Sequence, residues 1–110
     1  MISRHWKGVA RDEMAHSYID HLKRETFPKL SEIKGFVRSS ILVRKVEQGM
    51  EFLIITEWES MESIRAFAGE PADTAVVPPV VHEMMVDYDR KVIHYEINAE
   101  FKGLYEIHQR

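Results

Sequence analysis

The sequence predicts an α+β domain of the ferredoxin-like type, in which helices cover one face of a four-stranded antiparallel sheet. Three observations lead to this prediction. The chain has 110 residues, the length of one domain. Its hydrophobic periodicity runs in the order strand, helix, strand, strand, helix, strand. The third of these strands, residues 52–58, is apolar on both faces, which is typical of a strand covered on both sides.

The first half of the pattern begins with a strand over residues 2–9. A helix follows, whose apolar residues recur at the i, i+3, i+4 and i+7 spacing of one helical face: they are Ala15, Tyr18, Ile19 and Leu22. Pro28 lacks a backbone N–H and crowds the preceding turn, so we expect an interruption of the helix there. A further helical turn should reach Gly35, which suits a C-terminal cap with positive φ.

The second half contains a hairpin, two short helices and a last strand. The predicted elements are a strand over 36–46, a turn over 47–50, a strand over 52–58, helices over 61–68 and 79–85, and a strand over 91–98. Ser60 is the expected N-cap of the first helix and Gly69 its end. Between the two helices the chain lacks periodicity, and we expect it to be irregular.

A second copy of the chain is expected to cover the sheet face that the helices leave open. Both alternating sets of side chains on the 52–58 strand are substantially apolar, so the outward set needs a partner. The sequence therefore predicts a homodimer that packs through the open sheet face. Residues 1–98 form the predicted domain. The C-terminal extension, residues 99–110, carries four large apolar side chains and either packs on the partner subunit or is partly disordered.

The composition excludes several classes of protein. The chain contains no cysteine, which rules out disulfides, thiolate catalysis and iron–sulfur clusters. A net charge of -3 without a basic cluster argues against nucleic acid binding. The start of the chain lacks the apolar stretch of a signal peptide, and no segment approaches the ~20 apolar residues of a membrane span. We therefore expect a cytoplasmic protein with neither nucleic acid nor membrane as partner.

Three short segments are informative when they are taken together. They are, in order, Glu32-Ile33-Lys34-Gly35-Phe36, Glu57-Trp58-Glu59-Ser60 and Ile64-Arg65-Ala66-Phe67. In this order and at these spacings they resemble the antibiotic biosynthesis monooxygenase family of dimeric α+β barrels. The resemblance covers about residues 2–98 of the chain. It implies a dimeric barrel, in a family that includes cofactor-independent quinone-forming monooxygenases and haem-degrading enzymes.

The same resemblance argues against haem as a cofactor. The haem-degrading branch uses an asparagine on the first strand, a tryptophan on the helix after the third strand, and a histidine further along. By spacing, these positions fall near His5, on Phe67 and near Val77, and none of the three residues is present. His82 lies beyond the Pro78-Pro79 pair and is not expected to act as an axial ligand. We expect no cofactor.

The monooxygenase-like branch requires a base, an apolar pocket and polar donors, because a phenol or hydroquinone must lose a proton before its anion reduces dioxygen. Histidine is the natural base near neutral pH. The expected sheet order places the last strand beside the first, and thus His94 beside His5. These two histidines are the candidate catalytic residues. In the alternative interpretation they are a satisfied pair within the sheet.

Five aromatic side chains are the candidate substrate-binding residues: Trp6, Tyr18, Trp58, Phe67 and Tyr95. Two arginines, Arg4 and Arg38, lie within strand patterns. An arginine at such a position either binds an acidic substrate or pairs with an acid such as Glu57 or Glu96. The chain has no HExxH motif and no two histidines four residues apart, so we expect no metal site.

The predicted function is that of a small cofactor-independent monooxygenase acting on an apolar or aromatic small molecule. Two alternatives stay open, namely a non-catalytic ligand-binding or stress-related dimer and an isomerase-type proton transfer. The fold does not separate them, because one fold hosts unrelated chemistries. An enzyme should contain an enclosed pocket of roughly a few hundred Å³ with one of the two histidines exposed to it.

Overall fold

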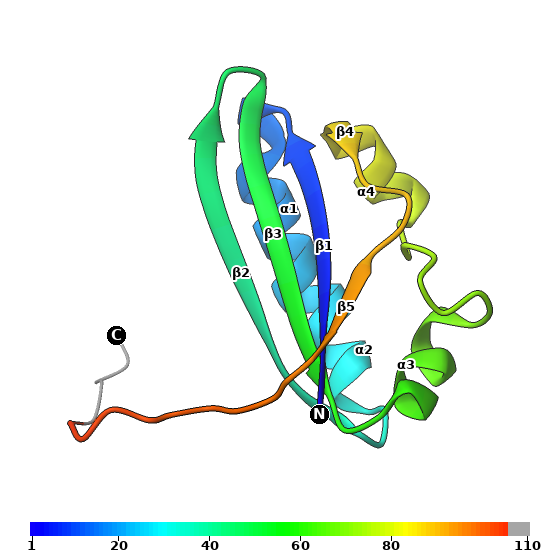
Figure 1. Ribbon diagram of the computed structural model, residues 1–110. Coiled ribbons are helices and arrows are strands. Elements are labelled where there is room, and N and C mark those ends of the chain that lie inside the picture. The colour runs from blue at the N-terminus through cyan, green and yellow to red at the C-terminus, as the bar shows by residue number, and fades with distance from the viewer. Residues whose placement is uncertain (106–110) are drawn as a thin grey trace.

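The computed structural model describes residues 1–105, which form an antiparallel sheet with helices on one face (Figure 1). The long strands are β1 (Ile2–Ala10), β2 (Phe36–Val46) and β3 (Gly49–Trp58), in the order β2-β3-β1. β1 and β3 pair along their whole length, so that β1 lies inside the sheet and β2 forms one edge. The predicted ferredoxin-like α+β fold is confirmed.

Two short strands share the other edge of the sheet. β4 (Met85–Tyr88) pairs with the end of β1, and β5 (Ile93–Glu96) pairs with its start. The last strand, expected over 91–98, is therefore in its predicted place beside β1 but is shorter than predicted. β4 was not predicted, because four residues are too few to show the alternation of a strand.

A long helical segment, Asp12 to Ser31, covers one face of the sheet. It consists of a 3-10 turn η1 (Asp12–Met14), α1 (Ala15–His21), a π-helical stretch η2 (Leu22–Thr26) and α2 (Phe27–Ser31). The interruption predicted at Pro28 is wrong. A π-helical stretch directly before the proline changes the hydrogen-bond pattern there, and Pro28 lies in the first turn of α2, where its missing N–H costs little.

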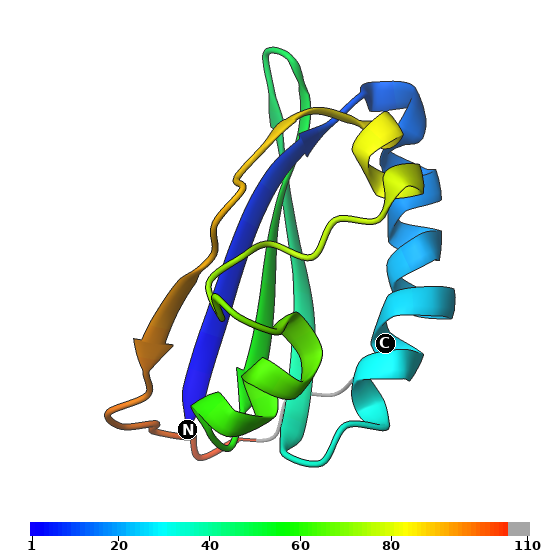
Figure 2. The same cartoon turned by 90° about the vertical axis from the view of Figure 1, so that its right-hand side faces the viewer.

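The second helical region begins and ends at the predicted residues. α3 (Met61–Ala68) is capped by Ser60, whose Oγ accepts a hydrogen bond from the Ser63 N–H at 3.3 Å. α3 ends at Gly69, which has a φ of 73°, and α4 (Pro79–Met84) begins with its proline. Residues 69–78, here called the strap, run from α3 to α4 across the space between the sheet and the long helical segment (Figure 2).

The core lies between the sheet and the helices and consists of two clusters. The larger one contains Ala10, Tyr18, Leu22, Phe52, Ile54, Val81, Met84 and Met85. The smaller one contains Leu30, Trp58 and Ile64. The predicted stripe of the first helix thus meets one alternating set of β3, and the strap closes the space beside both clusters.

The opposite face of the sheet is the open face, because no helix of residues 1–105 covers it. The alternation of β3 directs Leu53 and Ile55 to this face, while β5 contributes Ile93 and Tyr95. The last two side chains are 55% and 53% exposed. The apolar surface expected from the 52–58 strand therefore lies on this face.

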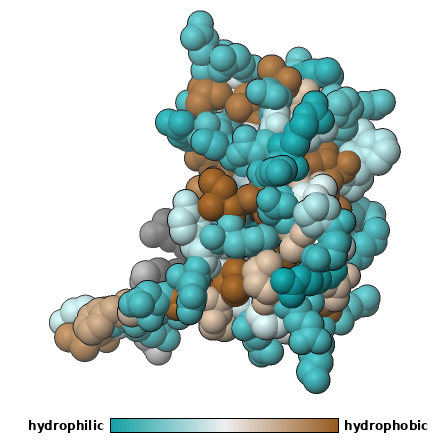
Figure 3. All heavy atoms as spheres, turned by 45° about the vertical axis from the view of Figure 1, so that its right-hand side comes forward, coloured by the Kyte–Doolittle hydropathy of each residue, from teal (hydrophilic) through white to brown (hydrophobic). Residues whose placement is uncertain are grey.

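Residues 98–105, here called the arm, extend away from the sheet (Figures 1 and 3). Phe101, Leu104 and Tyr105 are 96%, 95% and 91% exposed. The last five residues of the predicted extension, including Ile107, lie outside the described residues. Among the helices of residues 1–105, none is long and apolar enough to cross a membrane.

Candidate functional site

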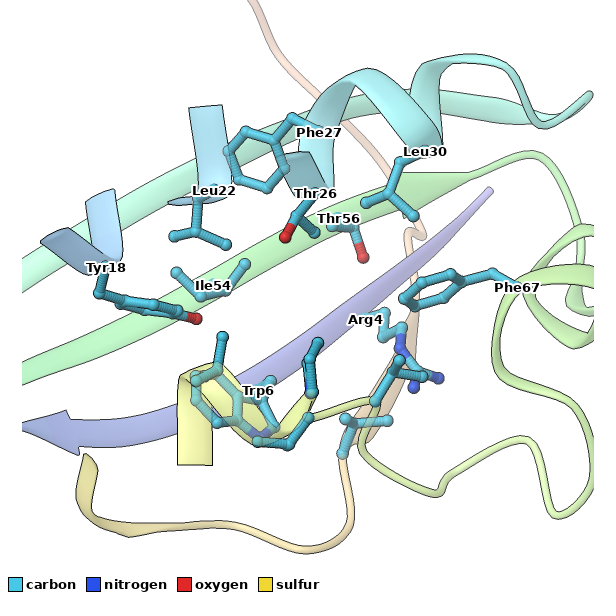
Figure 4. A pocket seen from close by; sticks show the side chains of 15 residues that line it. Arg4, Trp6, Tyr18, Leu22, Thr26, Phe27, Leu30, Ile54, Thr56 and Phe67 are labelled. Carbon is cyan, nitrogen blue, oxygen red and sulfur yellow. The ribbon is translucent and has the colours of Figure 1, made fainter. Parts of the chain in front are cut away.

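A cavity lies between the helix-facing side of the sheet and the helices (Figure 4). Its volume is about 70 Å³. A buried water molecule needs about 10–15 Å³, so the cavity has room for several waters or a few heavy atoms. It is smaller than the few hundred Å³ expected for an enzyme pocket.

The alternation of the strands supplies the floor of the cavity. Arg4 and Trp6 of β1 point to the helix side, as do Ile54 and Thr56 of β3. The long helical segment supplies the opposite wall with its buried face: Tyr18, Leu22, Thr26, Phe27 and Leu30. The site therefore results from two ordinary amphipathic patterns that face each other.

The remaining walls come from the second half of the chain. Phe67 of α3 lies at one end, and Val81 of α4 and Val92 lie along the side. The strap closes the cavity with the segment 76–78, two valines and a proline. Apart from Val92, the strap is the part of this lining that has no helix or strand structure.

Arg4 is the charged residue of the lining, and its guanidinium is held by three acceptors. Nη1 donates to the Ala72 carbonyl at 2.7 Å and to His94 Nε2 at 2.9 Å. Nη2 donates to the Thr74 carbonyl at 2.9 Å. Because arginine has only donors, His94 Nε2 is the acceptor, and its ring is neutral with the proton on Nδ1. Arg4 thus connects β1 to the strap and to β5.

The Arg4 charge is almost removed from solvent, since the side chain is only 4% exposed. Burial lowers the pKa of Arg4 to about 10, against the opposing effect of the nearby Asp73 carboxylate. The Cζ atom lies 5.6 Å from the centre of the Phe67 ring, a cation–π distance. Within residues 1–105, Arg4 forms no ion pair with a carboxylate.

His94 is held neutral by its surroundings. Burial lowers its pKa, and the positive charge of Arg4 lowers it further, while Asp73 acts in the opposite direction. A neutral imidazole next to a cation keeps its acceptor lone pair on Arg4.

Tyr18 brings a hydroxyl group to the middle of the cavity. The side chain is 3% exposed and packs edge-on against Phe52, with 4.9 Å between ring centres. Its oxygen points toward Trp6 and Ile54 (Figure 4), and none of the side-chain hydrogen bonds of residues 1–105 involves it. Burial raises the pKa of Tyr18, so the hydroxyl keeps its proton at neutral pH and is a donor.

Three of the five aromatic residues predicted to bind substrate line the cavity: Trp6, Tyr18 and Phe67. Trp58 is fully buried behind Phe67, with the two rings stacked at 5.8 Å, and its Nε1 donates to Thr56 Oγ1 at 2.9 Å. Trp58 therefore supports the wall without forming it. Tyr95 does not line the cavity, because it lies on the open face.

The predicted pairing of His5 with His94 is wrong by one residue. β5 pairs with β1 so that His94 lies opposite Arg4, and His5 lies opposite Ile93. Successive residues of a strand point to opposite faces, so the two histidines lie on opposite sides of the sheet. A shift of one residue in pairing register is beyond what strand patterns determine.

His5 belongs to a separate group of contacts on the open face. Its Nε2 lies 2.8 Å from Ser3 Oγ, and its ring centre lies 4.9 Å from that of Tyr95. Burial lowers the pKa of His5. The sheet separates His5 from the cavity, so it cannot act as base for a molecule bound there. A catalytic role for His5 stays a prediction.

The two strand arginines differ in their partners. Arg38 pairs with Glu57 across the strands at 3.6 Å, as the sequence predicts. Arg4 pairs with neither Glu57 nor Glu96, because it points to the helix side, where the strap carbonyls accept its hydrogen bonds.

The strap is the part of the site that the sequence pattern did not identify. Two adjacent valines, Val76 and Val77, in a segment without periodicity are the signal that could have found it. Met84 and Met85 belong to the core. Within residues 1–105, no three His, Asp or Glu side chains are grouped to hold a metal ion.

Solved structures with the same fold come from several bacteria. A candidate antibiotic biosynthesis monooxygenase from Bacillus cereus is 16% identical, with 96% of this chain and 98% of that chain covered and a TM-score of 0.64. Its counterpart from Deinococcus radiodurans is 16% identical, with 96% and 100% covered and a TM-score of 0.62. The heme-degrader MhuD from Mycobacterium tuberculosis, with two hemes in its active site, is 16% identical, with 93% and 100% covered and a TM-score of 0.59.

At these identities the likeness concerns the fold alone. No curated protein matches the chain. The model of the antibiotic biosynthesis monooxygenase family matches residues 2–77, from β1 into the strap. This range includes the three segments that first suggested the family, and most of the cavity lining. The chain belongs to the antibiotic biosynthesis monooxygenase family.

Proposed function

We propose that the protein is a cofactor-independent monooxygenase that oxidises an aromatic small molecule in the cavity between sheet and helices. The observation that carries this proposal is the cavity itself, an apolar, aromatic-walled space with one buried cation, Arg4, and one free hydroxyl, Tyr18. Such a space excludes water while it offers donors to a developing anion.

In the proposed reaction a bound phenol first loses its proton. A ring carbon of the anion then forms a bond to dioxygen, giving a hydroperoxide, and loss of water leaves a quinone. One phenol and one dioxygen thus give one quinone and one water, with the phenolic proton and one ring hydrogen leaving in the water. The phenol supplies all the electrons, so the balance requires no cofactor.

Two polar side chains of the lining have proposed roles in these steps. Arg4 stabilises the negative oxygen, and the Tyr18 hydroxyl donates a hydrogen bond to the opposite side of the substrate. His94 holds Arg4 in place and is not the base for a molecule in the cavity, because its Nε2 lone pair accepts from Arg4 and its ring does not line the cavity. The phenol gives its proton to water as it binds. His5 has no role here, since it lies on the other face of the sheet.

Haem degradation fits the residues less well. At the positions where the resemblance implies a tryptophan and a histidine, Phe67 and Val77 face the cavity. His82 is on the surface, where its Nδ1 lies 2.8 Å from the Tyr88 hydroxyl. No histidine of the described chain lines the cavity, so the donor set lacks the imidazole ligand that this chemistry requires.

A substrate needs more space than the cavity now provides. A cavity of about 150 Å³ holds one benzene molecule, whereas this one measures about 70 Å³. Residues 73–75 of the strap are bonded to residues 90–92 by backbone hydrogen bonds, whereas the segment 76–78 that closes the cavity belongs to no helix or strand. We infer that this segment moves outward to admit the substrate.

Oxygen consumption tests the proposal. We expect a panel of one-ring and two-ring phenols, 1-naphthol included, to give one quinone per dioxygen consumed. Replacing Tyr18→Phe should lower kcat by on the order of 10²-fold, the loss typical of one oxyanion donor, while Tyr105→Phe on the exposed arm should not. Binding of panel members without oxygen uptake above the protein-free rate would favour the alternative, a non-catalytic ligand-binding dimer.

We further propose that the protein is a homodimer that packs through the open face. Exposed Ile93 and Tyr95 support this proposal. A second sheet would cover these apolar side chains. In this arrangement the apolar side chains of the arm pack on the partner subunit.

A further inference from the structure

We propose that the ligand of this cavity is an aromatic anion, whose negatively charged oxygen pairs with the Arg4 guanidinium while its ring fills the apolar space. The inference rests on the proposed function only in that it uses the same cavity. It adds the charge of the ligand, which the reaction class leaves open.

The first argument is the state of the Arg4 charge. A charge removed from water is costly unless an opposite charge pairs with it, and Arg4 is 4% exposed. Its three acceptors are two backbone carbonyls and a neutral imidazole, none of which carries a negative charge. The Asp73 carboxylate influences Arg4 from a distance but forms no ion pair with it.

The second argument is the count of donors. A guanidinium has five N–H groups, of which three are used, two on Nη1 and one on Nη2. The Nε–H and the second Nη2 hydrogen have no partner within residues 1–105. These two donors are available to a ligand, and a guanidinium can donate to both oxygens of a carboxylate through adjacent nitrogens.

The third argument is what surrounds the cation. From Arg4 toward Tyr18 most of the lining is apolar or aromatic, with Phe67 beside the guanidinium and Ile54 beside Tyr18, while the hydroxyls of Thr26 and Thr56 lie between the two ends (Figure 4). Coulomb attraction is stronger in such a space than in water. Among residues 1–105, no acidic side chain that would repel an anion lines the cavity. A cation at one end and apolar walls beyond it complement a molecule with an anionic head and a ring.

Arg4 also has a structural task, because it holds two carbonyls of the strap. Holding these two carbonyls uses only some of the N–H groups of Arg4, and an uncharged donor could form the same hydrogen bonds. A charge kept in the cavity lining despite the desolvation cost is explained by the anion that it binds.

The test compares two probes of equal shape, benzoate and benzamide, by calorimetric titration of the wild-type protein at neutral pH. We expect benzoate to bind at least about ten-fold more tightly than benzamide, the range of a charge-assisted pair. The Arg4 Nε–H resonance should shift on addition of benzoate. Equal affinity of the two probes, or a shift at other arginines only, would overturn the proposal.

Variants then assign the preference to Arg4. Arg4→Met, similar in length and uncharged, should abolish the preference and leave benzamide affinity within a few-fold, while Arg24→Met on the exposed helix surface should keep it. If Arg4→Met does not fold, Arg4→Lys supplies the answer, because it keeps the charge and loses the fork, and benzoate affinity should fall several-fold. A preference unchanged in Arg4→Met or Arg4→Lys contradicts the assignment.

A second pair of measurements separates the sources of the negative oxygen. Binding of 4-nitrophenol is measured at pH values below and above the pKa of the compound itself. If a single anionic oxygen is enough, 4-nitrophenol should bind more tightly as the phenolate. If two oxygens are needed, only benzoate should bind. Both outcomes support an anion site. If the protein prefers benzoate but consumes no oxygen, the anion site is supported and the monooxygenase activity is refuted. If it consumes oxygen but shows no preference for an anion, the monooxygenase activity is supported and the anion site is refuted.

Discussion

The Arg4 side chain joins three parts of the chain, since it donates to two carbonyls of the strap and to His94 of β5. The contact with His94 depends on pH, because a protonated imidazole has no lone pair for the guanidinium. Protonation would also place two positive charges side by side. Asp73 is the acidic group near this pair and favours the charged form of both.

The first prediction concerns stability against pH. The pKa of His94 is lowered from 6.5 in the folded chain, so below that pH the unfolded chain binds more protons than the folded one. The free energy of unfolding should therefore fall as the pH drops from about 7 toward 5, and recover above the unfolded pKa. Urea unfolding at a series of pH values measures this slope.

His94→Gln should reduce that slope, because glutamine accepts a hydrogen bond from Arg4 and does not titrate. His16→Gln, at an exposed position of α1, is the matched control and should leave the slope unchanged. Some slope should remain from His5, whose pKa is also lowered. An equal slope in wild type and His94→Gln would show that the Arg4–His94 contact does not respond to pH.

At this scale the sequence identifies side chains but not their partners. Strand alternation places Arg4 and Trp6 on one face, and helix periodicity places Tyr18 opposite them, so three members of the site follow from local pattern. The partners of Arg4 do not follow, because they are carbonyls of an irregular segment about 70 residues away. The pairing of His5 with His94 fails for a related reason, since register depends on the turn that precedes β5.

Helix and strand ends follow from local chemistry where a single residue determines them. Ser60 and Gly69 act as predicted, since caps and positive φ values depend on a few neighbouring atoms. Gly35 has the predicted positive φ but does not cap the helix, which ends at Ser31 with Glu32 as its C-cap. Pro28 does not end its helix, because the π-helical stretch before it alters the backbone hydrogen bonds at the position where Pro28 lacks an N–H. β4 depends on pairing with the end of β1, a contact that no local pattern encodes.

Gly35 allows a prediction at the scale of elements, because it lies where the helical segment turns into β2. Its φ is 98°, and a Cβ there would lie 2.5 Å from Ser63 Oγ and 2.6 Å from Ser63 Cβ. Gly35→Ala should therefore lower the free energy of unfolding by about 1–3 kcal/mol. Gly103→Ala, where nothing lies closer than 4.0 Å, should have no such effect. Urea unfolding of both variants decides the comparison.

At the scale of the whole molecule, the open face is the surface through which we propose that two copies associate. Its ion pairs affect this association as well as its apolar residues. Arg38 and Glu57 pair on it, and so do Arg44 and Glu51, at 3.6 and 2.6 Å. Paired charges reduce the cost of covering the face with a second copy. The fold class can be predicted from the order of helices and strands. The association of two copies cannot, because it depends on the shape and charge of the open face, and the sequence pattern shows only that this face is apolar.

Leu53→Glu tests the proposed dimer. A carboxylate in the middle of the open face would be buried without a partner, so we expect a monomer by light scattering at concentrations where the wild type is a dimer. Val80→Glu is the control, since Val80 is exposed on α4, away from the sheet. A Leu53→Glu protein that stays dimeric would place the interface elsewhere.

The attachment of the strap has a consequence for how this site can evolve. Arg4 binds the strap through carbonyl groups of Ala72 and Thr74, and every amino acid has a carbonyl. Substitutions at these two positions therefore leave the attachment in place. Residues 76–78, a few positions further, form part of the cavity wall. Substitutions at residues 76–78 can thus change which molecule the cavity binds, while Arg4 still holds the strap over the cavity. The substrate selectivity of the site can therefore change during evolution without loss of the fold.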